Sequence, residues 1–149
     1  MTDIKAQLAA IAALQPASRL EAVLKVAREF SPEEFRAALP STQMGPEGPV
    51  LVRVTLVSES YLVDLHLTDP ELSFDFVLRT GIGNYRVALG EVTVKVKEEE
   101  ERRFQTARID LMYLSGSPIH TELTYVGMER AAWLNEVREA IPVASLLSV

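Results

Sequence analysis

The chain has 149 residues, which is the length of one ordinary domain and enough to bury a hydrophobic core. It contains no cysteine, so disulfides, thiolate zinc sites and cysteine nucleophiles are excluded. The net charge is −6 and the isoelectric point is near 5.0. Because an acidic surface repels phosphate groups, we expect no nucleic-acid partner and no binding to anionic membranes.

Two further features of the sequence concern the location of the protein. The first ten residues lack the basic start and the apolar run of a signal peptide. No apolar stretch reaches the roughly 18 residues that a membrane-spanning helix requires. We therefore expect a cytoplasmic protein.

Residues 1–40 have the apolar spacing of amphipathic helices, with a break at Gln15-Pro16 between the first and the second. The apolar stripes of these two helices contain Leu8, Ile11, Leu20, Val23, Leu24 and Ala27. Ser31 followed by Pro32 and two glutamates predicts a short third helix, which ends before Pro40. Residues 41–49 are rich in glycine and proline, which is typical of a linker.

From residue 50 onward the apolar residues recur with a period of two, which predicts strands. The predicted strands are residues 50–56, 63–67, 72–78, 85–89, 92–97, 104–114 and 119–125. Only short turns separate them, so the pattern favours an antiparallel meander that forms a barrel or a sandwich.

A closing helix with Trp133 on its apolar face follows the strands and ends at Pro142. The fold class is therefore α+β. The expected organisation is a helical segment at 1–40, a linker at 41–49, an antiparallel β-barrel with its capping helix at 50–142 and a tail at 143–149.

The closing helix begins with Glu129-Arg130 and has Trp133 three residues after the arginine. Seven strands followed by such an E-R-x-x-W helix resemble the layout of pleckstrin-homology-like domains, over residues 50–141. The resemblance implies that Trp133 packs on the barrel and that the helix caps one of its open ends.

The best-known ligand of that family is a phosphoinositide head group, bound by basic residues of the first two strands and the loop between them. In the strand region, Arg53 is the only basic residue before Arg79, and five acidic residues lie between the two. Because a polyphosphate requires charge-assisted donors, we expect no phosphoinositide binding. Other domains of this shape bind peptides or proteins along a strand edge or a helix.

Several polar residues have spacings that suggest catalysis. Asp64 and His66 lie two residues apart and would share a strand face, as a base and its orienting group do. Asp64 and Asp75 would lie on neighbouring strands as an acid pair, but a sugar cleft also needs stacking aromatics. An exposed strand surface accounts for these residues more simply, so we predict no catalytic residue and no enzyme.

Two other motifs suggest ligands. Gly81-x-Gly83 has Arg86 where a dinucleotide fingerprint needs glycine, and a strand follows, so a hairpin turn is the better interpretation. The run Glu98–Glu101 lacks the alternating turn residues of a calcium loop and predicts a solvated charge cluster. We therefore predict no cofactor and no metal.

The function that this sequence favours is a non-catalytic protein-interaction module. The stripes of the N-terminal helices need a cover, which is the barrel, a second copy of the chain or another protein. We predict that they form the interaction surface, so that the partner is another protein or the same chain in a homodimer. The alternatives are a small-molecule carrier with an apolar cavity inside the barrel, and a hydrolase whose site the sequence does not reveal.

Overall fold

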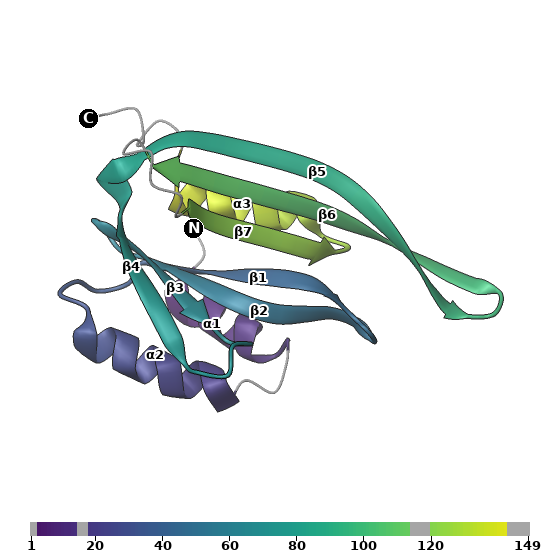
Figure 1. Ribbon diagram of the computed structural model, residues 1–149, viewed down its shortest axis with the longest axis horizontal. Helices are drawn as coiled ribbons and strands as arrows, with labels where there is room; N and C mark the ends of the chain where they lie inside the picture. Colours follow the sequence, from purple (N-terminus) through teal and green to yellow (C-terminus); the bar gives the residue numbers. More distant parts are fainter. Residues whose placement is uncertain (1–2, 15–17, 114–119, 143–149) are drawn as a thin grey trace.

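A computed structural model describes residues 3–14, 18–113 and 120–142, and it has the predicted α+β class (Figure 1). Two helices come first, α1 (Ile4–Ala12) and α2 (Ser18–Phe30). A four-stranded antiparallel sheet follows, made of β1 (Ala37–Gly45), β2 (Gly48–Val57), β3 (Tyr61–His66) and β4 (Ser73–Leu78). The 3-10 turn η1 (Arg79–Gly81) leads to a three-stranded antiparallel sheet of β5 (Ile82–Lys97), β6 (Glu100–Tyr113) and β7 (His120–Gly127). Helix α3 (Arg130–Ala140) comes last, and the two sheets are not closed into a barrel.

The segment between the helices and the sheet differs from the prediction. Residues 31–36 form no helix, and the predicted linker is part of the β1–β2 hairpin. The Ser31 hydroxyl accepts a bond from the amide of Glu33 and donates to its carbonyl, so it closes a local turn instead of capping a helix. Gly48, with φ of 129°, completes the hairpin turn in a conformation that favours glycine.

The second half of the sheet also differs in detail. The predicted strands 85–89 and 92–97 are one continuous strand of 16 residues, β5. Gly90 forms no turn there, because it pairs with Thr106 in the middle of the ladder. A Cβ at this position would lie 3.0 Å from the Thr106 hydroxyl, so Gly90 reflects a close approach of the strands. The described part of the chain has seven strands, which is the predicted number, but one of them is different. The fusion removes one predicted strand, and β1, which the sequence did not predict, takes its place in the count.

The four-stranded sheet has a hydrophobic core on each side. The helix-side core lies under α1 and α2 and contains Ile11, Leu20, Val23, Ala27, Ala38, Leu51, Val54, Leu56, Val63 and Leu65. The inter-sheet core lies against the other sheet and α3 and contains Ala37, Leu39, Val57, Leu62, Ile82, Ala107, Ile109, Leu111, Leu123, Trp133, Val137 and Ile141. Adjacent residues of β1 belong to different cores, as the alternation of side chains in a strand requires.

The two sheets meet where β1 lies beside β7 (Figure 1). Hydroxyl groups of β1 join them, since Ser41 Oγ accepts from the amide of Thr124 at 3.2 Å and Thr42 Oγ1 accepts from that of Val126 at 2.8 Å. These bonds satisfy backbone donors at the edge of β7. In the described part of the chain, no helix is long and apolar enough to cross a membrane.

Candidate functional site

The predicted interaction surface of the N-terminal helices is covered. Ile11, Leu20, Val23 and Ala27 are buried in the helix-side core, and Leu8 and Leu24 pack against it. The four-stranded sheet is thus the cover that these stripes needed, and the expectation that they face a partner is wrong. The polar side chain of Gln7 is buried with them and accepts a bond from the Ala38 amide at 2.9 Å, which fixes α1 to β1.

The structure brings together the three polar residues that the sequence suggested for catalysis. Asp64 and Asp75 are directly opposite each other on β3 and β4. His66, however, contacts Asp75 and not Asp64, with 2.7 Å between Nε2 and the carboxylate oxygen. Asp64 is instead buried and accepts a 2.7 Å hydrogen bond from the Thr55 hydroxyl on β2. The expected exposed strand surface is therefore wrong for Asp64.

The environment of Asp64 is unfavourable to charge. Burial raises the pKa of this carboxyl. The hydrogen bond from Thr55 and the positive charge of Arg53 lower the pKa, but they offset only part of that rise. Burial also raises the pKa of Tyr113 on β6, and the negative charges of Asp64 and Asp75 raise it further. Asp64 and Asp75 of the four-stranded sheet thus act through their charges on a phenol of the other sheet.

We call the polar residues between the two sheets the inter-sheet polar cluster, and they are Thr55, Asp64, His66, Asp75, Tyr113 and Thr121. The hydroxyl groups of this cluster hydrogen-bond to groups other than the histidine. Thr55 donates to Asp64, and Tyr113 and Thr121 hydrogen-bond to each other. A base activates a nucleophile through a hydrogen bond between the two groups. The hydrogen bonds of these three hydroxyls go to other partners and not to the imidazole of His66. Each of these hydrogen bonds lies within one sheet, which is typical of polar side chains that satisfy one another where two sheets face each other.

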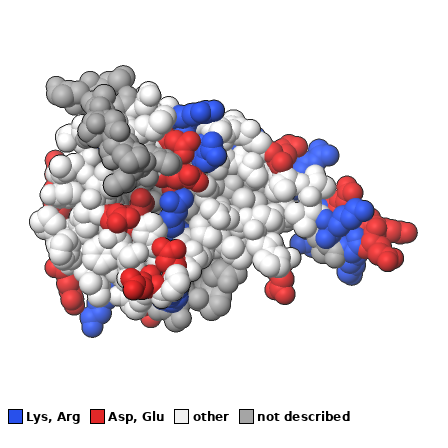
Figure 2. Space-filling model, viewed as in Figure 1, with Lys and Arg blue, Asp and Glu red and all other residues white. Residues whose placement is uncertain are grey.

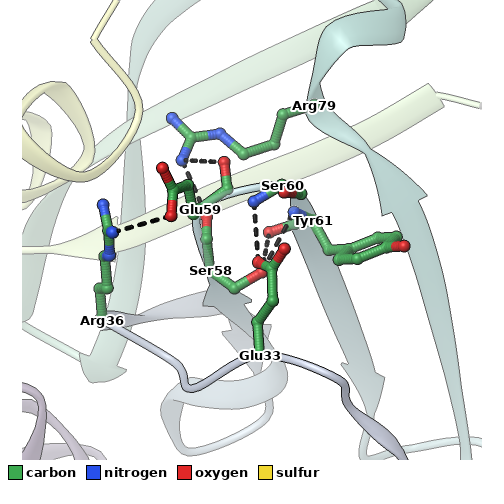
Figure 3. A network of polar contacts seen from close by, with 7 residues as sticks. All are labelled: Glu33, Arg36, Ser58, Glu59, Ser60, Tyr61 and Arg79. Carbon is green, nitrogen blue, oxygen red and sulfur yellow. Dashed lines mark hydrogen bonds and ion pairs between the residues drawn. The ribbon is translucent and has the colours of Figure 1, made fainter.

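A second polar network fixes the segment before β1 to the end of the four-stranded sheet. Figure 3 shows its members, which are Glu33, Arg36, Ser58, Glu59, Ser60, Tyr61 and Arg79. The Glu33 carboxylate accepts from the Ser60 amide at 2.9 Å, and hydrogen bonds from Ser60 lower the pKa of that carboxyl. Arg79 donates to the Ser58 carbonyl at 2.8 Å. The network ties the β2–β3 turn and the first residue of η1 to residues that the sequence assigned to a helix.

The acidic run near residue 100 lies at the tip of the long β5–β6 hairpin, where side chains of both signs gather (Figure 2). Glu101 is opposite Lys95, and Glu100 is opposite Lys97. Among the described residues, no group of three or more His, Asp or Glu side chains is placed to hold a metal ion.

The three-stranded sheet leaves apolar side chains uncovered on its edge strand β5. Val87 and Leu89 are 46% and 57% exposed, although their partners on β6, Ile109 and Ala107, are buried. The difference arises because α3 packs mainly on β7, β1 and β6. Arg130, the first residue of α3, donates to the carbonyls of Gly90 and Thr106 and so fixes the helix beside this edge.

The alternation of Val87 and Leu89 is visible in the sequence, but their exposure is not. A single sequence does not tell which strand of a sheet is its edge.

In comparisons with known proteins, no family model, curated protein or solved structure matched the chain. The resemblance to pleckstrin-homology-like domains stays a prediction.

Proposed function

We propose that the protein is a non-catalytic protein-interaction module of the cytoplasm that binds an extended segment of another protein along β5. The observation that carries the proposal is the exposure of Val87 and Leu89 on an edge strand. An edge strand has backbone donors and acceptors that a peptide satisfies by adding as a further strand. Both side chains lie on one face of β5, so they would contact alternate side chains of such a peptide.

The position of α3 supports this site. The bonds of Arg130 to Gly90 and Thr106 hold the helix next to β5 without covering it. Leu134 of α3 is only partly buried and packs against the inter-sheet core. A bound segment would therefore lie between an open strand edge and a helix, and apolar residues at every second position would suit it best.

The alternative of a small-molecule carrier is less favoured. Bulky side chains, including Leu62, Ile109 and Leu111, occupy the space between the sheets and are almost completely buried. An apolar ligand would have to displace them, at a cost in packing. A catalytic function is also less favoured, because the hydroxyls of the polar cluster are engaged with each other and with Asp64.

The test is a selection of binders from a library of random 12-residue peptides, followed by calorimetry on the wild type and two variants. We expect Leu89→Lys to weaken binding at least tenfold, because a charge would face the apolar side chains of the peptide. Met128→Lys is the matched control, since Met128 is exposed and lies outside β5. Selected peptides that bind Leu89→Lys as tightly as the wild type, or a library that gives no binder, would contradict the proposal.

A further inference from the structure

The surface between α2 and β4 carries the second exposed apolar cluster. Val26 and Phe30 come from α2, and Phe74, Phe76 and Leu78 come from β4; we call these five residues the aromatic edge. Phe30 is 69% exposed and Leu78 is 55% exposed. The Phe30 ring lies 5.3 Å from that of Phe76 and 5.9 Å from that of Phe74, between centroids. Large side chains that pack together yet face water indicate a contact surface.

The strand beneath these rings has an open side. β4 is the edge of the four-stranded sheet, and among the described residues no strand pairs with its outer side. Figure 1 shows β4 at the end of the sheet, next to α2. An unpaired edge beside exposed aromatic rings is a template for another strand.

The sequence of β4 is compatible with its own copy. In an antiparallel pairing about a twofold axis at Phe76, Phe74 lies opposite Leu78 of the second copy, and the two Phe76 residues face each other. Asp75 then lies opposite Val77. No like charges meet in this register, whereas an axis at Asp75 would place two carboxylates directly opposite each other.

The distribution of charge also favours a second copy. Residues 1–40, which contain α2, have five basic and five acidic side chains, so they are neutral, whereas the whole chain has a net charge of −6. The α2 part of the aromatic edge therefore adds no net repulsion between two copies, and β4 adds one carboxylate for each copy, Asp75, which this register places opposite Val77. Next to Phe30, Arg28 and Glu29 are both exposed and have opposite signs, so this end of α2 has no net charge.

We propose that the chain forms a homodimer through the aromatic edge, in which β4 pairs with β4 of a second copy and two four-stranded sheets become one. Phe30 of each copy covers the joined strands on the helix side. The part of α2 that contributes to the dimer surface is thus its outer side and not its buried stripe. The surface is separate from the β5 edge, so both partners can bind at once.

Sedimentation equilibrium between about 1 and 200 µM measures the mass. We expect the wild type to approach twice its chain mass of 16.5 kDa at the upper concentrations. Leu78→Lys and Phe30→Asp should stay at the mass of one chain throughout. Leu78 is 55% exposed, and Phe30→Asp removes only the contacts of a 69% exposed ring with Phe74 and Phe76, so both variants should stay folded. Leu89→Lys, on β5, should dimerise like the wild type, which separates this proposal from the peptide site.

A cross-link tests the register. The chain has no cysteine, so introduced thiols react only with each other. Opposite residues of an antiparallel pair have the Cα separation that a disulfide needs, about 4.5–5.5 Å. An oxidised mixture of Asp75→Cys and Val77→Cys chains should therefore give more dimer than either variant alone. A wild type that stays monomeric, a Leu78→Lys variant that still dimerises, or equal cross-linking in the three samples would overturn the proposal.

Discussion

The indole Nε1 of Trp133 donates a hydrogen bond to the carbonyl oxygen of Pro40, at 2.8 Å. The contact joins α3 to β1, across 93 residues of sequence. It fixes the helix at the place where the two sheets meet, because β1 lies beside β7 there. The acceptor, the Pro40 carbonyl, belongs to β1, which begins at Ala37, in a segment that the sequence predicted to be a helix.

Replacement of Trp133 should destabilise the fold strongly. Trp133→Ala removes a buried ring from the inter-sheet core and should cost about 3–5 kcal/mol of unfolding free energy. Trp133→Phe keeps most of the ring but leaves the Pro40 carbonyl without its donor, at about 1–3 kcal/mol. Urea unfolding followed by circular dichroism measures both values. Ala132→Ser, at an exposed position of α3, should change the free energy by less than about 0.5 kcal/mol. A comparable loss in Ala132→Ser would contradict this account.

The strands of this protein were the most predictable part of the sequence. Alternation with period two located β2, β3, β4, β6 and β7, because one face of each strand packs against a core. The E-R-x-x-W helix was placed within two residues of its observed ends. The failures were at Ser31 and Gly90, where each residue has a different role from the one that its type suggested. The Ser31 hydroxyl closes a turn instead of a helix cap, and Gly90 permits a close approach of strands.

The candidate sites were less predictable, for a physical reason. The spacing of Asp64, His66 and Asp75 indicated neighbouring positions, and the register confirmed that Asp64 and Asp75 are opposite each other. Burial depends on what covers a face, and the sequence does not contain that information directly. For the same reason Leu20, Val23 and Ala27 of the predicted surface are buried, whereas Phe30, seven positions after Val23, is exposed.

The Glu33 carboxylate should stabilise the fold at neutral pH. Hydrogen bonds from Ser60 lower its pKa in the folded state. A lowered pKa gives stability that is present above the unfolded value of about 4.3 and is lost as the pH falls through the folded pKa. Glu33→Gln should therefore unfold at a lower urea concentration than the wild type at neutral pH, and the difference should disappear in acid. Glu34→Gln, at the exposed neighbouring position, is the control. A deficit of Glu33→Gln that persists unchanged in acid would refute this assignment.

Acidic vesicles should not retain the protein. The stretch from Val54 to Leu78 has no lysine or arginine, and the net charge of the chain is −6. A phosphoinositide head group requires charge-assisted donors, and anionic lipids repel an acidic surface. In sedimentation with vesicles of phosphatidylcholine containing phosphoinositide or phosphatidylserine, we expect the protein to stay in the supernatant at physiological salt. Salt-sensitive pelleting would disprove the expectation and would direct attention to the basic residues of the β5–β6 hairpin.

Asp64 should have the opposite effect on stability to Glu33. Burial raises the pKa of its carboxyl in the folded state. When an acid has a raised folded pKa, the folded state binds more protons than the unfolded one between the two pKa values. The stability therefore falls as the pH rises from the unfolded value of about 3.9 through the folded pKa. Each unit of difference between the two pKa values corresponds to about 1.4 kcal/mol.

Asp64→Asn should remove this loss, because the amide has no charge to desolvate and still offers an oxygen to the Thr55 hydroxyl. We expect the variant to be more stable than the wild type at about pH 8 and to lose that advantage near pH 4, as measured by urea unfolding. Thr55→Val should act in the other direction at about pH 8, since the bond from its hydroxyl has the largest of the effects that lower the pKa of Asp64. Asp69→Asn, at an exposed turn, is the control for a general effect of charge. If Asp64→Asn is less stable than the wild type at pH 8, the ionised carboxylate contributes bonds that outweigh its burial, and the prediction is wrong.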